Sequence, residues 1–151
     1  MTDEHFLRRA IALAERAVRD GVGQPFGAVV VQDGRIVGEG CNLVPSTCDP
    51  SAHAEIVALR DACQALGRTT LDGCTMYASC EPCAMCLAAL HLARIARLVF
   101  ATSAEQAAAC GYDARYLHDR LRQPTALPST QLLADEGAIA LGLGVKDRPG
   151  S

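Results

Sequence analysis

The pattern of apolar and polar residues predicts an α/β chain that begins with a helix and a hairpin. Apolar residues recur at helical spacing over residues 3–19, and two glycines follow as a stop signal. Residues 27–31 and 35–41 are rich in β-forming residues and flank Asp33 and Gly34, a strong hairpin-turn signal. The sequence therefore predicts an antiparallel strand pair directly after the first helix.

Helices and strands alternate after the hairpin. The first of these helices is expected to carry Ile56, Leu59 and Cys63 on one face. A hairpin followed by crossover connections predicts a mixed sheet with helices on both faces. Residues 130–145 are apolar and are expected to form a strand and then a helix. The other expected elements are helices over 52–65, 83–92, 104–109 and 113–122 and strands over 74–79 and 96–101.

Composition narrows the class of protein. The 151 residues, half of them hydrophobic, predict a single domain over residues 1–151 with a sizeable core. No apolar run reaches the length of a membrane span, and the acidic start lacks the features of a signal peptide, so a cytoplasmic location is expected. The net charge of −3 argues against a nucleic-acid partner. A local basic patch stays open, because the second half contains Arg94, Arg97, Arg115, Arg120 and Arg122.

Eight cysteines are many for a chain of this length. Disulfides are disfavoured if the protein is cytoplasmic, because thiols stay reduced there. Cys83 and Cys86 have the spacing of metal ligands, and Cys80, three residues earlier, is ambiguous. The remaining five are expected to be small buried residues: Cys41, Cys48, Cys63, Cys74 and Cys110.

Two short motifs about thirty residues apart suggest a metal site. His53 precedes Glu55 by two positions, and Cys83 and Cys86 are three apart, so that they share one helix face. Three such ligands leave one position of a tetrahedral zinc open, which is typical of catalytic rather than structural zinc. Glu55 would then be free to move protons. A closed structural site, with Cys80 or Glu55 as the fourth ligand, and a redox or zinc-buffering protein are the alternatives.

At these residues the chain resembles the cytidine deaminase-like superfamily, in its nucleobase deaminase branch, and bacterial guanine deaminases in particular. A His-x-Glu motif followed by Pro-Cys-x-x-Cys is the signature of zinc deaminases. The resemblance implies a three-layer α/β fold, with a five-stranded mixed sheet and helices on both faces, and a homodimer. The segments that carry it are Phe26-Gly27-Ala28-Val29, Asn42, Asp49-Pro50, Ala52-His53-Ala54-Glu55, Ser79 to Cys86, Cys86-Leu87-Ala88-Ala89 and Phe100.

The resemblance also implies roles for individual residues. Zn²⁺ would be held by His53, Cys83 and Cys86 and would activate a water molecule for hydrolysis. Glu55 would move protons between that water, a ring nitrogen and the leaving amine. The substrate would be contacted by Asn42, by the backbone N–H of Ala54 and by the ring of Phe26. For Phe26 core packing is an equally good interpretation, and for Asn42 a turn at a strand end is the alternative.

Guanine, converted to xanthine and ammonia, is the leading substrate because Gly111-Tyr112-Asp113 resembles the guanine deaminases. Asp113 would read an exocyclic amine, or it would simply precede a helix. Two departures weigh against guanine: Ala114 stands where a second aspartate is usual, and the tail over 142–148 has no aromatic residue. A cytosine, isocytosine or aminotriazine deaminase is the alternative, followed by a tRNA adenosine deaminase. The expected partner is a small heterocyclic amine, and neither a nucleic acid nor a membrane is expected.

Overall fold

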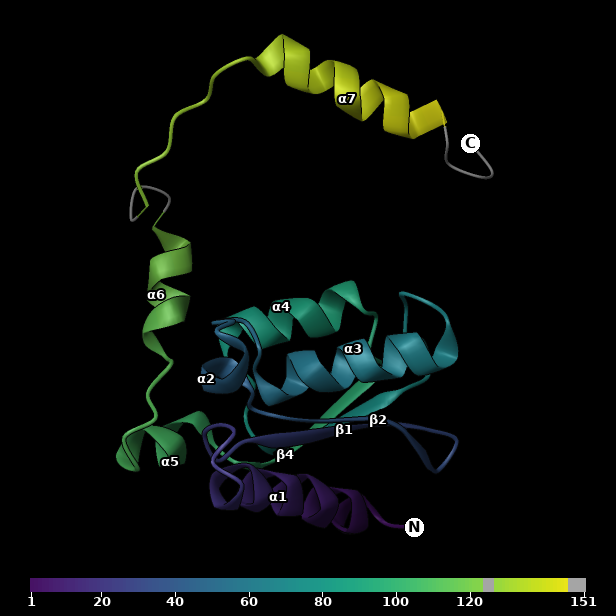
Figure 1. Ribbon diagram of the computed structural model, residues 1–151, viewed down its shortest axis with the longest axis vertical. Coiled ribbons are helices and arrows are strands. Elements are labelled where there is room, and N and C mark those ends of the chain that lie inside the picture. The colour runs from purple at the N-terminus through teal and green to yellow at the C-terminus, as the bar shows by residue number, and fades with distance from the viewer. Residues whose placement is uncertain (124–126, 147–151) are drawn as a thin grey trace. The chain divides into compact units, whose positions relative to one another are not determined.

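A mixed β-sheet organises the part of the chain that carries the predicted motifs (Figure 1). The computed structural model describes residues 1–123 and 127–146, and the chain divides into a unit over Met1–Asp119 and a second that begins at Arg120. The elements are α1 (Asp3–Arg19), β1 (Gly27–Gln32), β2 (Arg35–Cys41), α2 (Val44–Thr47), α3 (Ala54–Leu66), β3 (Thr75–Cys80), α4 (Ala84–Leu92), β4 (Arg97–Thr102), α5 (Ala104–Ala109), α6 (Tyr116–Arg122) and α7 (Ala134–Lys146).

The strand order is β2-β1-β3-β4. Strand β1 pairs antiparallel with both β2 and β3, whereas β4 runs parallel to β3, so the predicted mixed sheet is confirmed. The hairpin turn lies at Asp33 and Gly34, both of which have positive φ angles, as the sequence predicts. The register shifts between Val30 and Val31, and Val37 of β2 is the extra residue of the bulge at this point.

The prediction of a fifth strand is wrong for the described residues, within which the sheet has four strands. The expected strand near residue 130 is absent from 127–133, and α7 follows directly. Pro128 cannot donate to a strand ladder, and residues 129–131 are all polar. All residues over 127–133 are exposed, so no apolar face is buried there that would favour a strand.

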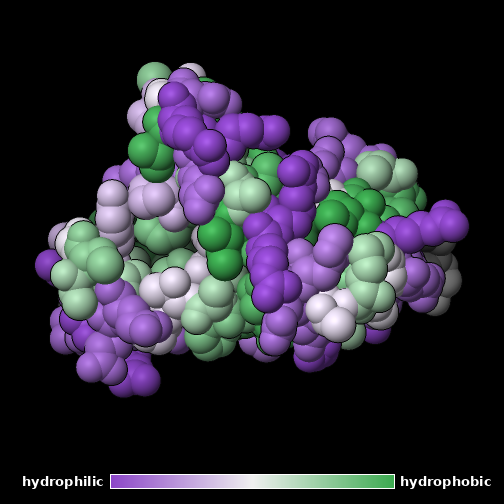
Figure 2. All heavy atoms as spheres, turned by 90° about the horizontal axis from the view of Figure 1, so that it is seen from below, coloured by the Kyte–Doolittle hydropathy of each residue, from purple (hydrophilic) through white to green (hydrophobic). Residues whose placement is uncertain are grey.

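Helices cover both faces of the sheet, as predicted (Figure 1). Side chains alternate along β1, so Val29 and Val31 pack with Phe6 and Leu13 of α1 on one face. The other face carries Ala28 and Val30 and packs against α3 and α4. Figure 2 views the molecule from the side of α1, where hydrophilic side chains alternate with smaller hydrophobic patches.

Helix α3 lies unusually close to β2 because glycine and alanine meet there. A Cβ on Gly40 would lie 2.4 Å from the carbonyl oxygen of Ala54, and one on Gly38 would lie 2.6 Å from that of Ala58. The buried face of α3 therefore consists largely of alanines together with Leu59. Of the three residues expected on one face, Leu59 is buried, whereas Ile56 and Cys63 are partly buried, and Cys63 packs against the core.

The start of α1 is tied to the sheet by polar contacts. Asp3 accepts hydrogen bonds from the Tyr77 hydroxyl at 2.7 Å and from Arg97 Nη1 at 2.9 Å. The Arg97 guanidinium and then the Tyr77 hydroxyl hold the pKa of Asp3 down, to about 2. Within the described ranges 1–123 and 127–146, no helix combines the length and the apolar character needed to cross a membrane.

All eight cysteines are free. The expectation that five of them are buried is correct only for Cys74. Cys48 and Cys110 are exposed because they lie at the ends of short helices, α2 and α5, that pack little of their surface against the sheet.

Candidate metal centre and adjoining cleft

Two helix N-termini bring the predicted metal ligands together. His53 is the residue before α3, and Cys83 is the residue before α4, each in an extended backbone conformation. Neither side chain caps its own helix, which leaves both free to point away from the helix end. Cys86 follows in the first turn of α4, on the same side as Cys83. The positive ends of two helix dipoles therefore lie near two thiols, which favours thiolates.

The distances fit a tetrahedral zinc ion. Nδ1 of His53 lies 3.6 Å from Sγ of Cys83 and 3.5 Å from Sγ of Cys86, and the three ligand atoms lie within 4.8 Å of one another. Zn–N and Zn–S bonds of about 2.0 and 2.3 Å at a tetrahedral angle place nitrogen and sulfur about 3.5 Å apart. The cluster includes neither Cys80 nor Glu55, so these three residues leave a fourth coordination position open.

Hydrogen bonding and burial shift the pKa values of these groups in different directions. A hydrogen bond from Cys86, with His53 beside it, lowers the pKa of Cys83 to about 4. The same contact and burial raise the pKa of Cys86, and the contact with Cys83 raises the pKa of His53. Burial raises the pKa of Cys80 to about 11, which keeps it a thiol. Burial also raises the pKa of Glu55, which is only 6% exposed.

A cleft of about 500 Å³ opens beside this cluster, a volume within the usual range for small-molecule sites. His53, Glu55 and Cys83 line its inner end. Phe26 and Tyr112 form an aromatic pair in its wall, with ring centroids 5.4 Å apart and planes at 89°. The other lining residues are Gln24, Asn42, Pro50, Cys80, Glu81, Pro82, Met85, Ala104, Ala107, Gly111, Asp113, Ala114, Arg115, Tyr116, Leu117 and His118.

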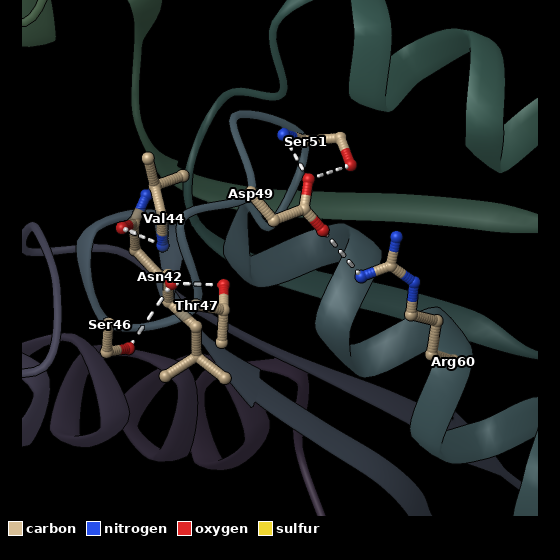
Figure 3. A network of polar contacts seen from close by, with 8 residues as sticks. Asn42, Val44, Ser46, Thr47, Asp49, Ser51 and Arg60 are labelled. Carbon is tan, nitrogen blue, oxygen red and sulfur yellow. Dashed lines mark hydrogen bonds and ion pairs between the residues drawn. The ribbon is translucent and has the colours of Figure 1, made fainter.

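Asn42 is buried at the edge of the cleft with its amide group oriented by the backbone. Its Oδ1 accepts a hydrogen bond from the N–H of Val44 at 3.2 Å (Figure 3). It also accepts one from the N–H of Gln24 at 3.3 Å. Among the described residues its Nδ2 has no hydrogen-bond partner. The donor end of the amide is therefore the part of Asn42 available to a ligand in the cleft.

The loop that leads to His53 is held by its own side chains (Figure 3). Asp49 accepts hydrogen bonds from the backbone N–H and the hydroxyl of Ser51, at 2.9 and 2.7 Å, and lies 3.5 Å from Arg60 of α3. Thr47 donates from its hydroxyl to the Leu43 carbonyl at 2.6 Å. The N–H of His53 then donates to the Ser51 carbonyl at 2.7 Å, so the loop fixes the backbone of the metal ligand.

The opposite side of the cleft is more exposed. Asp113 accepts three hydrogen bonds from Arg115: from the backbone N–H at 3.0 Å, from Nε at 2.9 Å and from Nη2 at 2.7 Å. These bonds lower the pKa of Asp113 to about 2, so its carboxylate is charged at neutral pH. Helix α6 begins only at Tyr116, so Asp113 forms a local turn rather than the expected start of a helix over 113–122.

Comparison with known proteins identifies the family. Residues 1–102 match the cytidine and deoxycytidylate deaminase zinc-binding region. The chain belongs to this deaminase family. It is 46% identical over 124 residues to guanine deaminase of Bacillus subtilis, covering 82% of this chain and 80% of that protein. The X-ray structure of guanine deaminase from Bacillus subtilis matches with a TM-score of 0.93 and 39% identity, over 100% of this chain and 98% of the other.

A second kind of relative is also similar to this deaminase. The tRNA-specific adenosine deaminase of Haemophilus influenzae is 40% identical over 136 residues, covering 89% of this chain and 78% of that protein. The protein is thus a zinc-dependent hydrolase that acts on C–N bonds. The predicted α/β fold class and the predicted zinc cofactor are confirmed at this level.

The structure places most of the predicted site residues of the deaminase around one cleft, whereas their roles stay predictions. His53, Glu55, Cys83, Asn42, Phe26 and Asp113 line it, and Cys86 is buried directly behind. Ala54 is fully buried and is not among the residues that line the cleft. The sequence reasoning assigned no role to Tyr112 and Gln24, although Tyr112 stands inside the Gly111-Tyr112-Asp113 segment and Gln24 lies just before Phe26.

Proposed function

We propose that this deaminase hydrolyses guanine to xanthine and ammonia. The observation that carries the proposal is the 46% identity to a guanine deaminase over most of the chain, together with a TM-score of 0.93 to a guanine deaminase structure. A single buried carboxyl group beside a three-ligand metal site supports the same reaction. The cleft of about 500 Å³ accommodates a purine base.

The residues divide the chemistry among them. His53, Cys83 and Cys86 would hold Zn²⁺, which when bound supplies a Lewis acid that makes water nucleophilic at neutral pH. Glu55 would take the proton of the attacking water, pass it to the adjacent ring nitrogen and protonate the amine as it leaves. The raised pKa of Glu55, caused by burial, suits a group that both accepts and returns a proton. Water adds at the amine-bearing carbon and the C–N bond breaks, with ammonia as the second product.

Substrate recognition is assigned to the groups around the cleft. Asn42 would donate from Nδ2 to the carbonyl oxygen of guanine, since its own carbonyl is already occupied. The Ala54 backbone N–H, free at the first turn of α3, would contribute from the helix end. Phe26 would stack on the base and Asp113 would accept an N–H of the substrate. Cytosine, isocytosine and aminotriazines remain alternative substrates of the same machinery.

The tRNA adenosine deaminases provide a second candidate function, supported by their 40% identity. Charge pairing favours the small molecule over a nucleic acid, because three of the arginines in the second half of the chain are paired with carboxylates and so attract phosphates less. Arg94 lies 3.0 Å from Asp72, and Arg115 lies 2.7 Å from Asp113. Arg97 is likewise paired with Asp3.

The test is ammonia release by the zinc-loaded protein from a panel of guanine, cytosine, isocytosine, ammeline, adenine and a tRNA anticodon hairpin. Turnover of guanine well above the other compounds is the expected result. Turnover of the hairpin alone would replace the proposal with RNA editing, and turnover of a pyrimidine or triazine alone would move it to that substrate. No turnover with one zinc bound per chain would favour a non-catalytic zinc site.

The proposal extends to a homodimer of a single-domain protein in the cytoplasm. Helix α4 is apolar except for His91, yet Leu92 is 83% exposed and Leu87 is 38% exposed. Such a face is stabilised by a partner. Sedimentation equilibrium should give twice the chain mass, and Leu92→Glu should shift the equilibrium towards monomer. A monomeric wild-type protein at micromolar concentration would contradict the dimer.

A further inference from the structure

Asn42 is the only asparagine of the chain, and its orientation depends on a segment from another part of the fold. The segment over residues 21–26 joins α1 to β1, and its Gln24 N–H donates to Asn42 Oδ1. The Asn42 backbone N–H donates in turn to the Phe26 carbonyl at 3.1 Å. Segment 21–26 and Asn42 therefore hold each other through both the backbone and the side chain of Asn42.

Gly23 lies in van der Waals contact with Asn42. A Cβ at Gly23 would lie 1.7 Å from the carbonyl oxygen of Asn42 and 2.9 Å from its Oδ1. The φ angle of Gly23 is outside the left-handed region, so closeness rather than backbone conformation requires glycine here. At Gly21 the backbone conformation requires glycine instead: its φ is +67°, and a Cβ there would meet open space.

A side chain at position 23 would separate the segment from Asn42. Cβ atoms essentially never approach other heavy atoms within 3.0 Å, so the gap must widen by more than about 1 Å. The bond from Gln24 N–H to Oδ1 is already 3.3 Å long. A further ångström takes it beyond the range of a hydrogen bond. One of the two donors that orient the Asn42 amide would then be lost.

We propose that Gly23 is a positioning residue for substrate recognition, which acts by keeping the Nδ2 end of Asn42 turned towards the cleft. The inference rests on the proposed function, in which Nδ2 donates to the carbonyl oxygen of guanine. If the amide rotates, its own carbonyl faces that oxygen and the hydrogen bond is replaced by repulsion between two acceptors. The role of Gly23 is therefore selective for substrates that carry a carbonyl group at this position.

The first test is Gly23→Ala, assayed with guanine. We expect kcat/KM to fall at least about tenfold, mainly through KM, because the hydrogen bond exists already in the bound ground state. Zinc content should stay at one per chain. Gly38→Ala is the matched control, since a Cβ there would lie 2.6 Å from the Ala58 carbonyl oxygen but far along β2 from Asn42. It should lower the melting temperature and leave KM unchanged.

A double-mutant cycle with Asn42→Ala separates positioning from general loosening of the fold. If Gly23 acts through Asn42, Gly23→Ala should add nothing to the loss already caused by Asn42→Ala. Additive losses in kcat/KM, or an equal rise of KM in Gly38→Ala, would overturn the proposal. A wild-type protein that does not turn over guanine would instead contradict the proposed function.

The single asparagine allows a measurement that does not depend on turnover. Protein labelled with ¹⁵N-asparagine should give one pair of side-chain NH₂ resonances, which guanine should shift in the wild type. In Gly23→Ala the pair should be displaced before any ligand is added, whereas in Gly38→Ala it should keep its position. An unchanged pair in Gly23→Ala would overturn the inference even if guanine is not the substrate.

Asn42→Asp is the variant to test if Gly23→Ala does not fold. Its carboxylate still accepts from Gln24 and Val44 but offers no donor to the cleft. The melting temperature and the zinc content should stay close to those of the wild type, and guanine binding should be lost. Guanine binding equal to that of the wild type, or instability as large as that of Asn42→Ala, would contradict the assigned orientation.

Discussion

The two sides of the cleft are built differently. The inner side, around Asn42 and Glu55, is buried: these residues are 3% and 6% exposed, and contacts with segment 21–26 hold Asn42. The outer side, around Tyr112 and Asp113, is exposed, with Tyr112 39% exposed and Asp113 bonded to a residue only two positions away. The chemistry therefore lies where the fold fixes it, and recognition on the outer side can change without unfolding the protein.

The largest expected effect comes from breaking the inner side at the metal. Cys86→Ser removes a buried thiolate ligand and should abolish both stoichiometric zinc binding and turnover. Cys80→Ser is the matched control, because Cys80 lies outside the ligand cluster, and it should retain one zinc per chain. The measurement is the zinc content per chain of both purified variants. Loss of zinc in Cys80→Ser would indicate a closed four-ligand site instead.

Removal of the metal from the wild type should have the same consequence. A chelator should eliminate turnover, and added Zn²⁺ should restore it. The melting temperature of the stripped protein should also fall, since zinc binding favours the folded chain. Full activity after verified removal of the metal would contradict the assignment of the site.

Glu55→Gln should leave zinc binding intact and lower kcat by about 10²- to 10⁴-fold, because the amide cannot carry the proton. Glu15→Gln on α1 is the control, an equally conservative change on the opposite face of the sheet, and should leave kcat unchanged. The measurement is steady-state turnover with zinc content determined in parallel. A kcat within a few-fold of the wild type would show that Glu55 is not the proton carrier.

The aromatic pair of Phe26 and Tyr112 connects the two sides of the cleft. Tyr112→Ala removes an edge-to-face contact worth about 0.5–1.5 kcal/mol and should raise KM by about two- to tenfold. Its melting temperature should fall less than that of Phe26→Ala, because Tyr112 is 39% exposed. Phe26→Ala should raise KM and also lower the melting temperature, since Phe26 packs partly against the core. Equal loss of stability in both variants would contradict the difference between the two sides.

The sequence predicted the inner side better than the outer one, for physical reasons. Ligand spacing and helix-start patterns are local, so His53, Cys83 and Cys86 could be found without a structure. Gly23 and Asn42 are in contact although they lie 19 positions apart in the sequence, and no local pattern reports such a contact.

The same distinction applies to the fold. The hairpin and α1 follow from local patterns, and both were predicted correctly. The alanines on the buried face of α3 lie against the two glycines of β2, a contact between distant segments that the helical pattern through Leu59 does not report. The expected strand near residue 130 was inferred from apolar content alone, although Pro128 and exposed surroundings oppose it. Residues 147 and 148 of the predicted tail lie outside the described residues.

The smallest expected effect is that of Asp113→Asn. The change removes a charge from the exposed outer side, so KM for guanine should rise by less than about tenfold while kcat and the melting temperature stay the same. Asp72→Asn is the control: Asp72 forms a similar exposed pair with Arg94, with side chains 50% and 67% exposed, outside the cleft.

The pH dependence of that effect follows from the lowered pKa of Asp113. A carboxyl with a depressed pKa contributes fully above its unfolded value near 3.8, and the contribution is lost only as pH falls towards about 2. The ratio of KM between Asp113→Asn and the wild type should therefore be constant from pH 8 to pH 5. A ratio that changes within this range would show that Asp113 titrates there, and hence that Arg115 does not hold its carboxylate when guanine is bound.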